Sequence, residues 1–91
     1  MEAKYIVFKH NGLEYPILFP VCLSHEDVVL KFNIVVVSAG FCKLGEEFWT
    51  KDGVLGRKLI AYGKSISLGK MSRAQDCDVL TRSFNFQIVT D

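Results

Sequence analysis

The sequence predicts an α+β domain in which a mostly antiparallel sheet of four to five strands carries two short helices on one face. A turn signal, Asn11-Gly12, separates two runs rich in β-branched and aromatic residues, as in a β-hairpin. Ser24 and Ser72 stand where helix N-caps are expected. A valine-rich apolar run at residues 34–41 is typical of a strand covered on both faces. Strands with helices packed against them bury these apolar stripes most simply.

The first elements follow from local chemistry. Residues 3–9 and 13–19 form the predicted hairpin, and Pro16 places the second strand at a sheet edge because proline cannot donate a ladder hydrogen bond. Ser24 with Asp27 three residues later is a capping pattern, which predicts a short helix over residues 25–32.

The valine-rich run at residues 34–41 is predicted to be the central strand. After it, Asp52-Gly53 is a second turn signal, and Phe48 with Trp49 fits either a short strand or an aromatic loop. A longer strand is expected over residues 57–68, with Gly63 marking a bulge.

The C-terminal part is expected to hold the second helix. Ser72 to Gln75 has the capping-box form, and apolar residues recur at helical spacing after it, which predicts a helix near residues 73–83. Residues 84–89 alternate strictly, so they are expected either to add an edge strand or to fray.

Composition indicates one soluble domain over residues 1–91. Hydrophobic residues make up 49% of the 91 residues and charged residues 23%, which suits a compact core without metals or disulfides. The start lacks the pattern of a secretory signal, and the purely apolar run at residues 34–37 is too short to cross a bilayer. We therefore expect a cytoplasmic protein that has no membrane partner.

The three cysteines are expected to be reduced thiols that act as small buried hydrophobes, because an odd number at wide spacing does not make a disulfide framework. Cys22 and His25 have the spacing of metal ligands. A structural zinc site needs a second such pair, and Cys42, Cys77 and His10 are scattered. The expectation is that the protein holds no metal and no cofactor.

The motifs of catalysis are incomplete. Gly63-Lys64-Ser65 ends like a phosphate-binding loop, but Lys58 stands where that loop needs a glycine. A nucleophile such as Cys22 or Ser38 would need a histidine beside it, and no local motif provides one. We therefore predict that the protein is not an enzyme, with a small enzyme that uses Cys22 or Ser38 together with a histidine as an alternative.

A basic segment is the most informative charge pattern. The net charge is only +1, but no acidic residue lies between Asp52 and Asp76, where five cations occur: Arg57, Lys58, Lys64, Lys70 and Arg73. We predict that these residues bind a partner, with Phe48 and Trp49 as aromatic anchors. The competing interpretation is that these residues belong to an ordinary solvated strand face. Alternate residues of a strand point to opposite sides, so the five cations need not form one patch.

Several motifs give the chain a resemblance to small uncharacterised proteins of bacteriophages and prophages. They lie at residues 19–20, 23–28, 37–41 and 63–68, and at Ser72, Arg73, Asp76 and Leu80. The chain departs from this pattern at Ala74, where proline is common, and in residues 48–55, which look inserted. The family has no established activity, so the resemblance implies an origin in a phage or prophage.

This origin suggests how such a protein acts. Small phage proteins without catalytic residues often occlude a surface of a host machine, as anti-CRISPR and other anti-defence proteins do, although this step is an analogy of class and size. The leading hypothesis is therefore a non-enzymatic accessory protein that binds and inhibits a host protein or defence complex in the bacterial cytoplasm. The alternative is a small domain that binds nucleic acid or a nucleotide through residues 57–73. A homodimer is compatible with the predicted edge strands.

Overall fold

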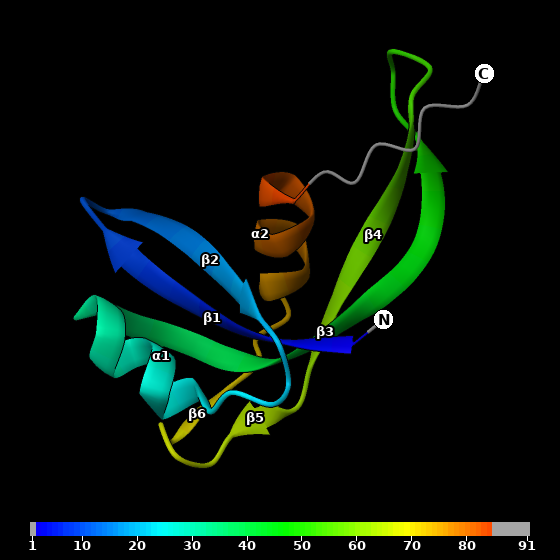
Figure 1. Ribbon diagram of the computed structural model, residues 1–91. Coiled ribbons are helices and arrows are strands. Elements are labelled where there is room, and N and C mark those ends of the chain that lie inside the picture. Colours follow the sequence, from blue (N-terminus) through cyan, green and yellow to red (C-terminus); the bar gives the residue numbers. More distant parts are fainter. Residues whose placement is uncertain (1, 85–91) are drawn as a thin grey trace.

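The N-terminal hairpin forms as predicted. The computed structural model describes residues 2–84, and it begins with β1 (Glu2–His10) antiparallel to β2 (Leu13–Phe19) (Figure 1). Asn11 and Gly12 join them with φ values of 51° and 79°, the positive pair that matches a tight turn to the twist of the strands.

A curled four-stranded antiparallel sheet has the order β2-β1-β3-β4 (Figure 1). The strand β3 (Val35–Trp49) lies between β1 and β4 (Leu55–Tyr62), so the prediction of a central strand is confirmed. It runs on through Phe48 and Trp49, and the turn at Asp52-Gly53 joins it to β4. The strand β2 lies at the edge, as Pro16 predicted.

The long strand predicted over residues 57–68 is wrong. Gly63 has a φ of 75°, which breaks the extended conformation after Tyr62, so this glycine ends the strand and does not form a bulge within it. A second small sheet follows, made of β5 (Lys64–Ser65) and β6 (Lys70–Met71). The turn between them is closed by a 3.2 Å hydrogen bond from the Gly69 N–H to the Ile66 carbonyl.

The two helices differ in how well the sequence predicted them. The helix α1 (His25–Phe32) has the predicted bounds, and the Ser24 hydroxyl accepts a 3.1 Å hydrogen bond from the Asp27 N–H. The helix α2 (Asp76–Ser83) begins later than residue 73. The predicted capping box does not form, because Gln75 makes no side-chain cap and the Arg73 N–H donates to the Asp76 carboxylate.

The two helices pack on opposite faces of the sheet (Figure 1). The predicted α+β fold with an antiparallel sheet is therefore confirmed. The prediction that both helices lie on one face is wrong. Consecutive side chains of β1 point to opposite faces, and Tyr5, Ile6 and Val7 are all buried. Tyr5 and Val7 pack with Val79 and Leu80 of α2, and Ile6 packs with Val28 of α1. Because β1 is apolar on both sides, each side needs its own helix.

The outer edge of β4 is covered by side chains of α2. The Leu59 N–H donates to the Thr81 hydroxyl at 3.0 Å, and the Ala61 N–H donates to the Cys77 Sγ at 3.3 Å. These contacts satisfy two amides that an edge strand would otherwise offer to another chain. Cys77 is half-buried, and Cys42 is buried as expected. Cys22 is exposed because it lies in the loop before α1, so the expectation that it is buried is wrong.

The strand or frayed tail expected at residues 84–89 lies outside the described residues from 85 onward. Phe84 itself follows α2 and packs against the cluster of Tyr5, Val7 and Leu80.

Replacing Thr81 with Val should lower the free energy of unfolding by about 1–2 kcal/mol, since the buried Leu59 amide loses its acceptor. Urea denaturation measures this change. Thr81→Ser is the matched control, because it keeps the hydroxyl and should retain most of the stability. A Thr81→Val variant as stable as the unaltered protein would contradict this role of the hydroxyl, because valine keeps the volume of threonine and removes only the acceptor.

Candidate functional site

Arg73, one of the five predicted partner-binding cations, lies in an internal ion network. Its guanidinium donates to the Glu14 carboxylate at 2.7 and 3.1 Å and to Asp76 Oδ1 at 2.9 Å. Asp76 is completely buried and also accepts a 2.5 Å hydrogen bond from the Tyr5 hydroxyl. We call Tyr5, Glu14, Arg73 and Asp76 the Asp76 network. The guanidinium of Arg73 is thus already hydrogen-bonded to carboxylates of its own domain.

The charges of the network shift the pKa values of its members in consistent directions. Hydrogen bonding to the Arg73 guanidinium lowers the pKa of Glu14 and, through the same bonds, raises the pKa of Arg73. Burial raises the pKa of Tyr5, and the bond to the Asp76 carboxylate raises it further. Tyr5 is therefore a neutral donor, and the guanidinium stays charged between two carboxylates.

Arg57 is also paired, but at the surface. It donates to the Glu47 carboxylate across the β3–β4 hairpin, and the two side chains are 30% and 47% exposed. Water screens such a pair, so its contribution to stability is small.

Arg73→Met should lower the free energy of unfolding by about 3–5 kcal/mol, because the buried Asp76 carboxylate would lose its cation. Arg57→Met is the matched control and should change it by about 0–1 kcal/mol, as expected of an exposed pair. Chemical denaturation of both variants measures the difference. Similar losses in the two variants would contradict a structural role particular to Arg73.

The remaining predicted residues fall into two groups, one on the β3–β4 hairpin and one on the small β5–β6 sheet (Figure 1). Phe48 and Lys58 line a hollow of about 430 Å³ beside α2, and Trp49 is 64% exposed at the end of β3. Lys64 and Lys70 belong to the small β5–β6 sheet. The structure therefore does not bring the predicted cations and aromatic anchors together in one patch.

The β5–β6 hairpin, residues 64–71, carries its two lysines next to exposed apolar side chains. Lys64 pairs with Met71 across the hairpin and Ser65 pairs with Lys70. Ile66 at the turn is 86% exposed and Met71 is 65% exposed. A hollow of about 340 Å³ runs along the hairpin, and the residues that line it include no carboxylate: Lys64, Ser65, Ile66, Gly69, Lys70 and Met71.

A groove, which we call the lysine groove, lies between this hairpin, the start of α1, the middle of β3 and the end of β4. Its volume is about 510 Å³, and its lining again includes no carboxylate: Lys4, Ser24, His25, Phe41, Tyr62, Gly63, Lys64, Ser65, Ile66 and Ser67. Sequence reasoning missed Lys4, Phe41 and Tyr62, because only strand pairing brings residues 4, 41 and 62 side by side.

Gly40 explains why the groove forms at this point. A Cβ atom there would lie 2.6 Å from the Tyr62 carbonyl oxygen, so only glycine lets the end of β4 lie so close to β3. The chain then turns at Gly63 and continues into β5.

His25 closes one wall of the lysine groove. It is 4% exposed, and its Nε2 lies 2.9 Å from the Gly40 carbonyl oxygen, with its ring edge-on to Phe19 and Phe41. Burial lowers the pKa of His25 below its ordinary value, and the Lys4 charge acts in the same direction. The folded protein thus holds this imidazole neutral.

Stability should fall as the pH drops below about 6.5, the ordinary pKa of histidine, because the unfolded chain takes up a proton that folded His25 disfavours. The paired carboxylate of Glu14 loses its charge only at lower pH, because its pKa is lowered. Urea unfolding at pH 7.5 and pH 5.5 measures the change. His25→Gln should flatten this dependence, and His10→Gln, in the exposed hairpin, should leave it intact. Unaltered pH dependence in His25→Gln would contradict the assignment.

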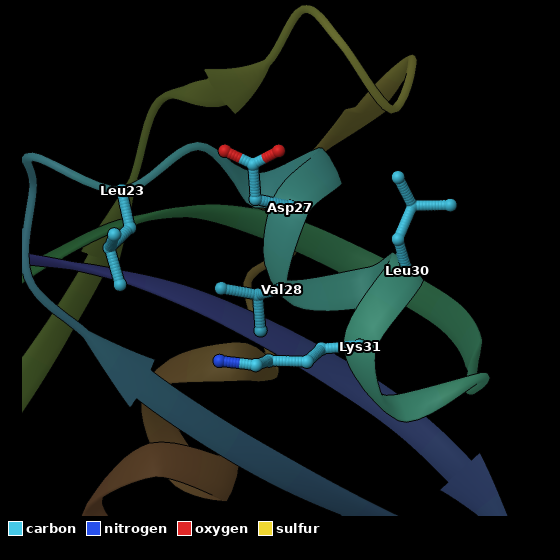
Figure 2. Close-up of a pocket in the computed structure, with 5 residues that line it drawn as sticks. All are labelled: Leu23, Asp27, Val28, Leu30 and Lys31. Atoms are coloured by element: carbon cyan, nitrogen blue, oxygen red, sulfur yellow. The ribbon is translucent and has the colours of Figure 1, made fainter.

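A further hollow, of about 400 Å³, lies between α1 and the loop that precedes it (Figure 2). Leu23 and Val28 face each other across it, and Asp27 and Lys31 also line it, with Leu30 (Figure 2). The charges of Asp27 and Lys31 are opposite and cancel, so the hollow does not favour a partner of either charge.

Among residues 2–84, neither Ser38 nor Cys22 forms a hydrogen bond with a histidine. Ser38 is buried, and its hydroxyl has no hydrogen-bond partner among residues 2–84. His25 is bonded to a backbone carbonyl, and His10 contacts Asn11. Cys22 is exposed in the loop before α1. Within residues 2–84, no group of three or more His, Cys, Asp or Glu side chains could hold a metal ion.

Comparison with family models, with curated proteins and with solved structures found no match for this chain. Neither helix in the part of the chain that the structure describes is long and apolar enough to cross a membrane.

Proposed function

We propose that this protein is a non-enzymatic binding domain whose β5–β6 hairpin docks on an acidic surface of another protein. The observation that carries the proposal is Ile66, which is 86% exposed on a turn flanked by Lys64 and Lys70. An apolar side chain held in water at the tip of a hairpin is a suitable anchor for a pocket on a partner.

The charge of the hairpin selects the kind of partner. None of the ion pairs formed within residues 2–84 includes Lys64 or Lys70, and no carboxylate lines the hollow beside them. Their charge is thus not offset locally, and it favours approach to an acidic surface. Ile66 and Met71 then supply the apolar contact.

The hairpin is also fixed in position before any partner binds. Ser72 donates to the Gly63 carbonyl from its N–H at 3.0 Å and from its hydroxyl at 2.9 Å. Leu68 packs against the cluster of Ile6, Phe19 and Val28, which ties the turn to the core. A preorganised surface loses less conformational entropy on binding, which favours affinity.

The mode of action follows from the shape of this surface. A small rigid domain that covers an acidic face of a larger protein blocks that face, so inhibition by occlusion is the action we propose. The phage or prophage origin, and a host defence complex as the partner, stay predictions from the resemblance. Direct binding of nucleic acid is less favoured, because Arg57 and Arg73 are engaged by carboxylates.

The proposal is tested by affinity capture from a bacterial lysate followed by binding measurements with the purified partner. Ile66→Asp, Met71→Asp and the pair Lys64→Glu with Lys70→Glu should each weaken binding by about tenfold or more, since an anchor contact contributes about 2 kcal/mol. Lys58→Glu and Trp49→Ser change residues that lie outside the hairpin and should leave the affinity unchanged.

Loss of binding in Trp49→Ser with full binding in Ile66→Asp would overturn the proposal in favour of the aromatic anchors at Phe48 and Trp49. Capture of nucleic acid with an affinity that falls steeply as salt is added would favour the nucleic-acid alternative.

A further inference from the structure

The lysine groove has the features of a ligand site that adjoins the docking tip of the hairpin and shares Lys64, Ser65 and Ile66 with it. Four segments far apart in the sequence build it: β1, the start of α1, the middle of β3, and residues 62–67, which run from the end of β4 through β5. Its volume of about 510 Å³ lies in the range of small-molecule sites, roughly 300–1,000 Å³.

Lys4 and Lys64 supply positive charge to the groove, and one carboxylate lies beside it, since Glu2 is hydrogen-bonded to the Tyr62 side chain. No ion pair among residues 2–84 includes Lys4 or Lys64, and no carboxylate lines the groove. Lys4 is held in place, because its ammonium donates to the Leu23 carbonyl at 2.7 Å and lies 6.0 Å from the centre of the Phe41 ring. An ammonium has three N–H donors, so Lys4 retains donors for a ligand.

The rest of the lining combines aromatic surface with hydroxyl groups. Phe41 and Tyr62 are stacked with their centres 5.8 Å apart, and both are half-buried. Ser65 is 3% exposed, and its hydroxyl lies 3.4 Å from that of Ser67. Hydroxyls and ammonium groups recognise phosphate oxygens, and aromatic rings accept an apolar body.

We propose that the lysine groove binds an organic phosphate that carries an aromatic or apolar group. The charges favour phosphate over carboxylate, because a phosphate monoester carries close to two negative charges at neutral pH and the groove presents two cations. The neutral His25 and the rings of Phe41 and Tyr62 then contact the uncharged part of the ligand.

The site goes beyond the proposed protein-docking function, and variants separate the two. Met71 and Lys70 line the hairpin hollow but not the groove, and Lys4 lines the groove but not the hairpin hollow. Met71→Asp should therefore weaken docking and retain phosphate binding, whereas Lys4→Gln should do the reverse.

The experiment is a titration of the isotope-labelled protein followed by amide NMR shifts, with phenyl phosphate as the probe and benzoate and inorganic phosphate as comparisons. Phenyl phosphate should shift the amides of residues 24–25 and 63–67 and bind more tightly than either comparison anion. Lys4→Gln and Lys64→Gln should each weaken it by about tenfold, as expected for loss of one charged hydrogen bond. Lys58→Gln, outside the groove, should leave the affinity unchanged.

Lys4→Gln also removes the bond to the Leu23 carbonyl, so thermal unfolding of this variant is recorded alongside the titration. Lys64 is exposed and makes no ion pair within residues 2–84, so Lys64→Gln should leave the fold intact. If Lys4→Gln unfolds, the affinity of Lys64→Gln for phenyl phosphate tests the proposal. The proposal is overturned if phenyl phosphate causes no shifts at residues 24–25 and 63–67. It is equally overturned if Lys64→Gln binds as tightly as Lys58→Gln, or if inorganic phosphate binds as well as phenyl phosphate.

Discussion

The buried Asp76 carboxylate is the constraint on which the arrangement of this domain depends. A charge with no exposure to water is tolerated only when donors surround it, and here Tyr5 and Arg73 provide them. Arg73 in turn reaches Glu14 on the edge strand, so one network joins β1, β2 and the start of α2. Removing one partner would leave an uncompensated charge in the interior, which explains why these elements hold one another in position.

This network also fixes the β5–β6 hairpin at its far end. The chain leaves the sheet at Gly63, forms the hairpin and returns at Arg73, while Ser72 bonds back to the Gly63 carbonyl. A segment held at both ends presents Ile66 in a defined place, although its own sheet has only two residues in each strand. The rigidity of the proposed docking surface thus comes from the core and not from the hairpin itself.

The sequence predicted those parts of the fold that are decided within a few residues. The Asn11-Gly12 turn, the edge position of β2 and the Ser24 cap of α1 each depend on neighbouring groups. The start of α2 could not be predicted in this way, because Asp76 is bonded to Tyr5, 71 residues away. The strand predicted over residues 57–68 failed for a local reason, since a strand bulge and a full break at Gly63 look alike in sequence.

The candidate sites show the same division between local and distant chemistry. Between Asp52 and Asp76 the sequence has cations but no acidic residue. It therefore did not indicate that Arg57 and Arg73 would pair with carboxylates from outside this segment, those of Glu47 and Glu14. The lysines of this segment, Lys58, Lys64 and Lys70, form no ion pair within residues 2–84, and Lys64 borders both the hairpin hollow and the lysine groove. An anion in the groove would neutralise the charge of Lys64, which on the proposed docking surface attracts an acidic partner. Because such coupling is reciprocal, partner binding would weaken the groove's affinity for the anion by the same factor.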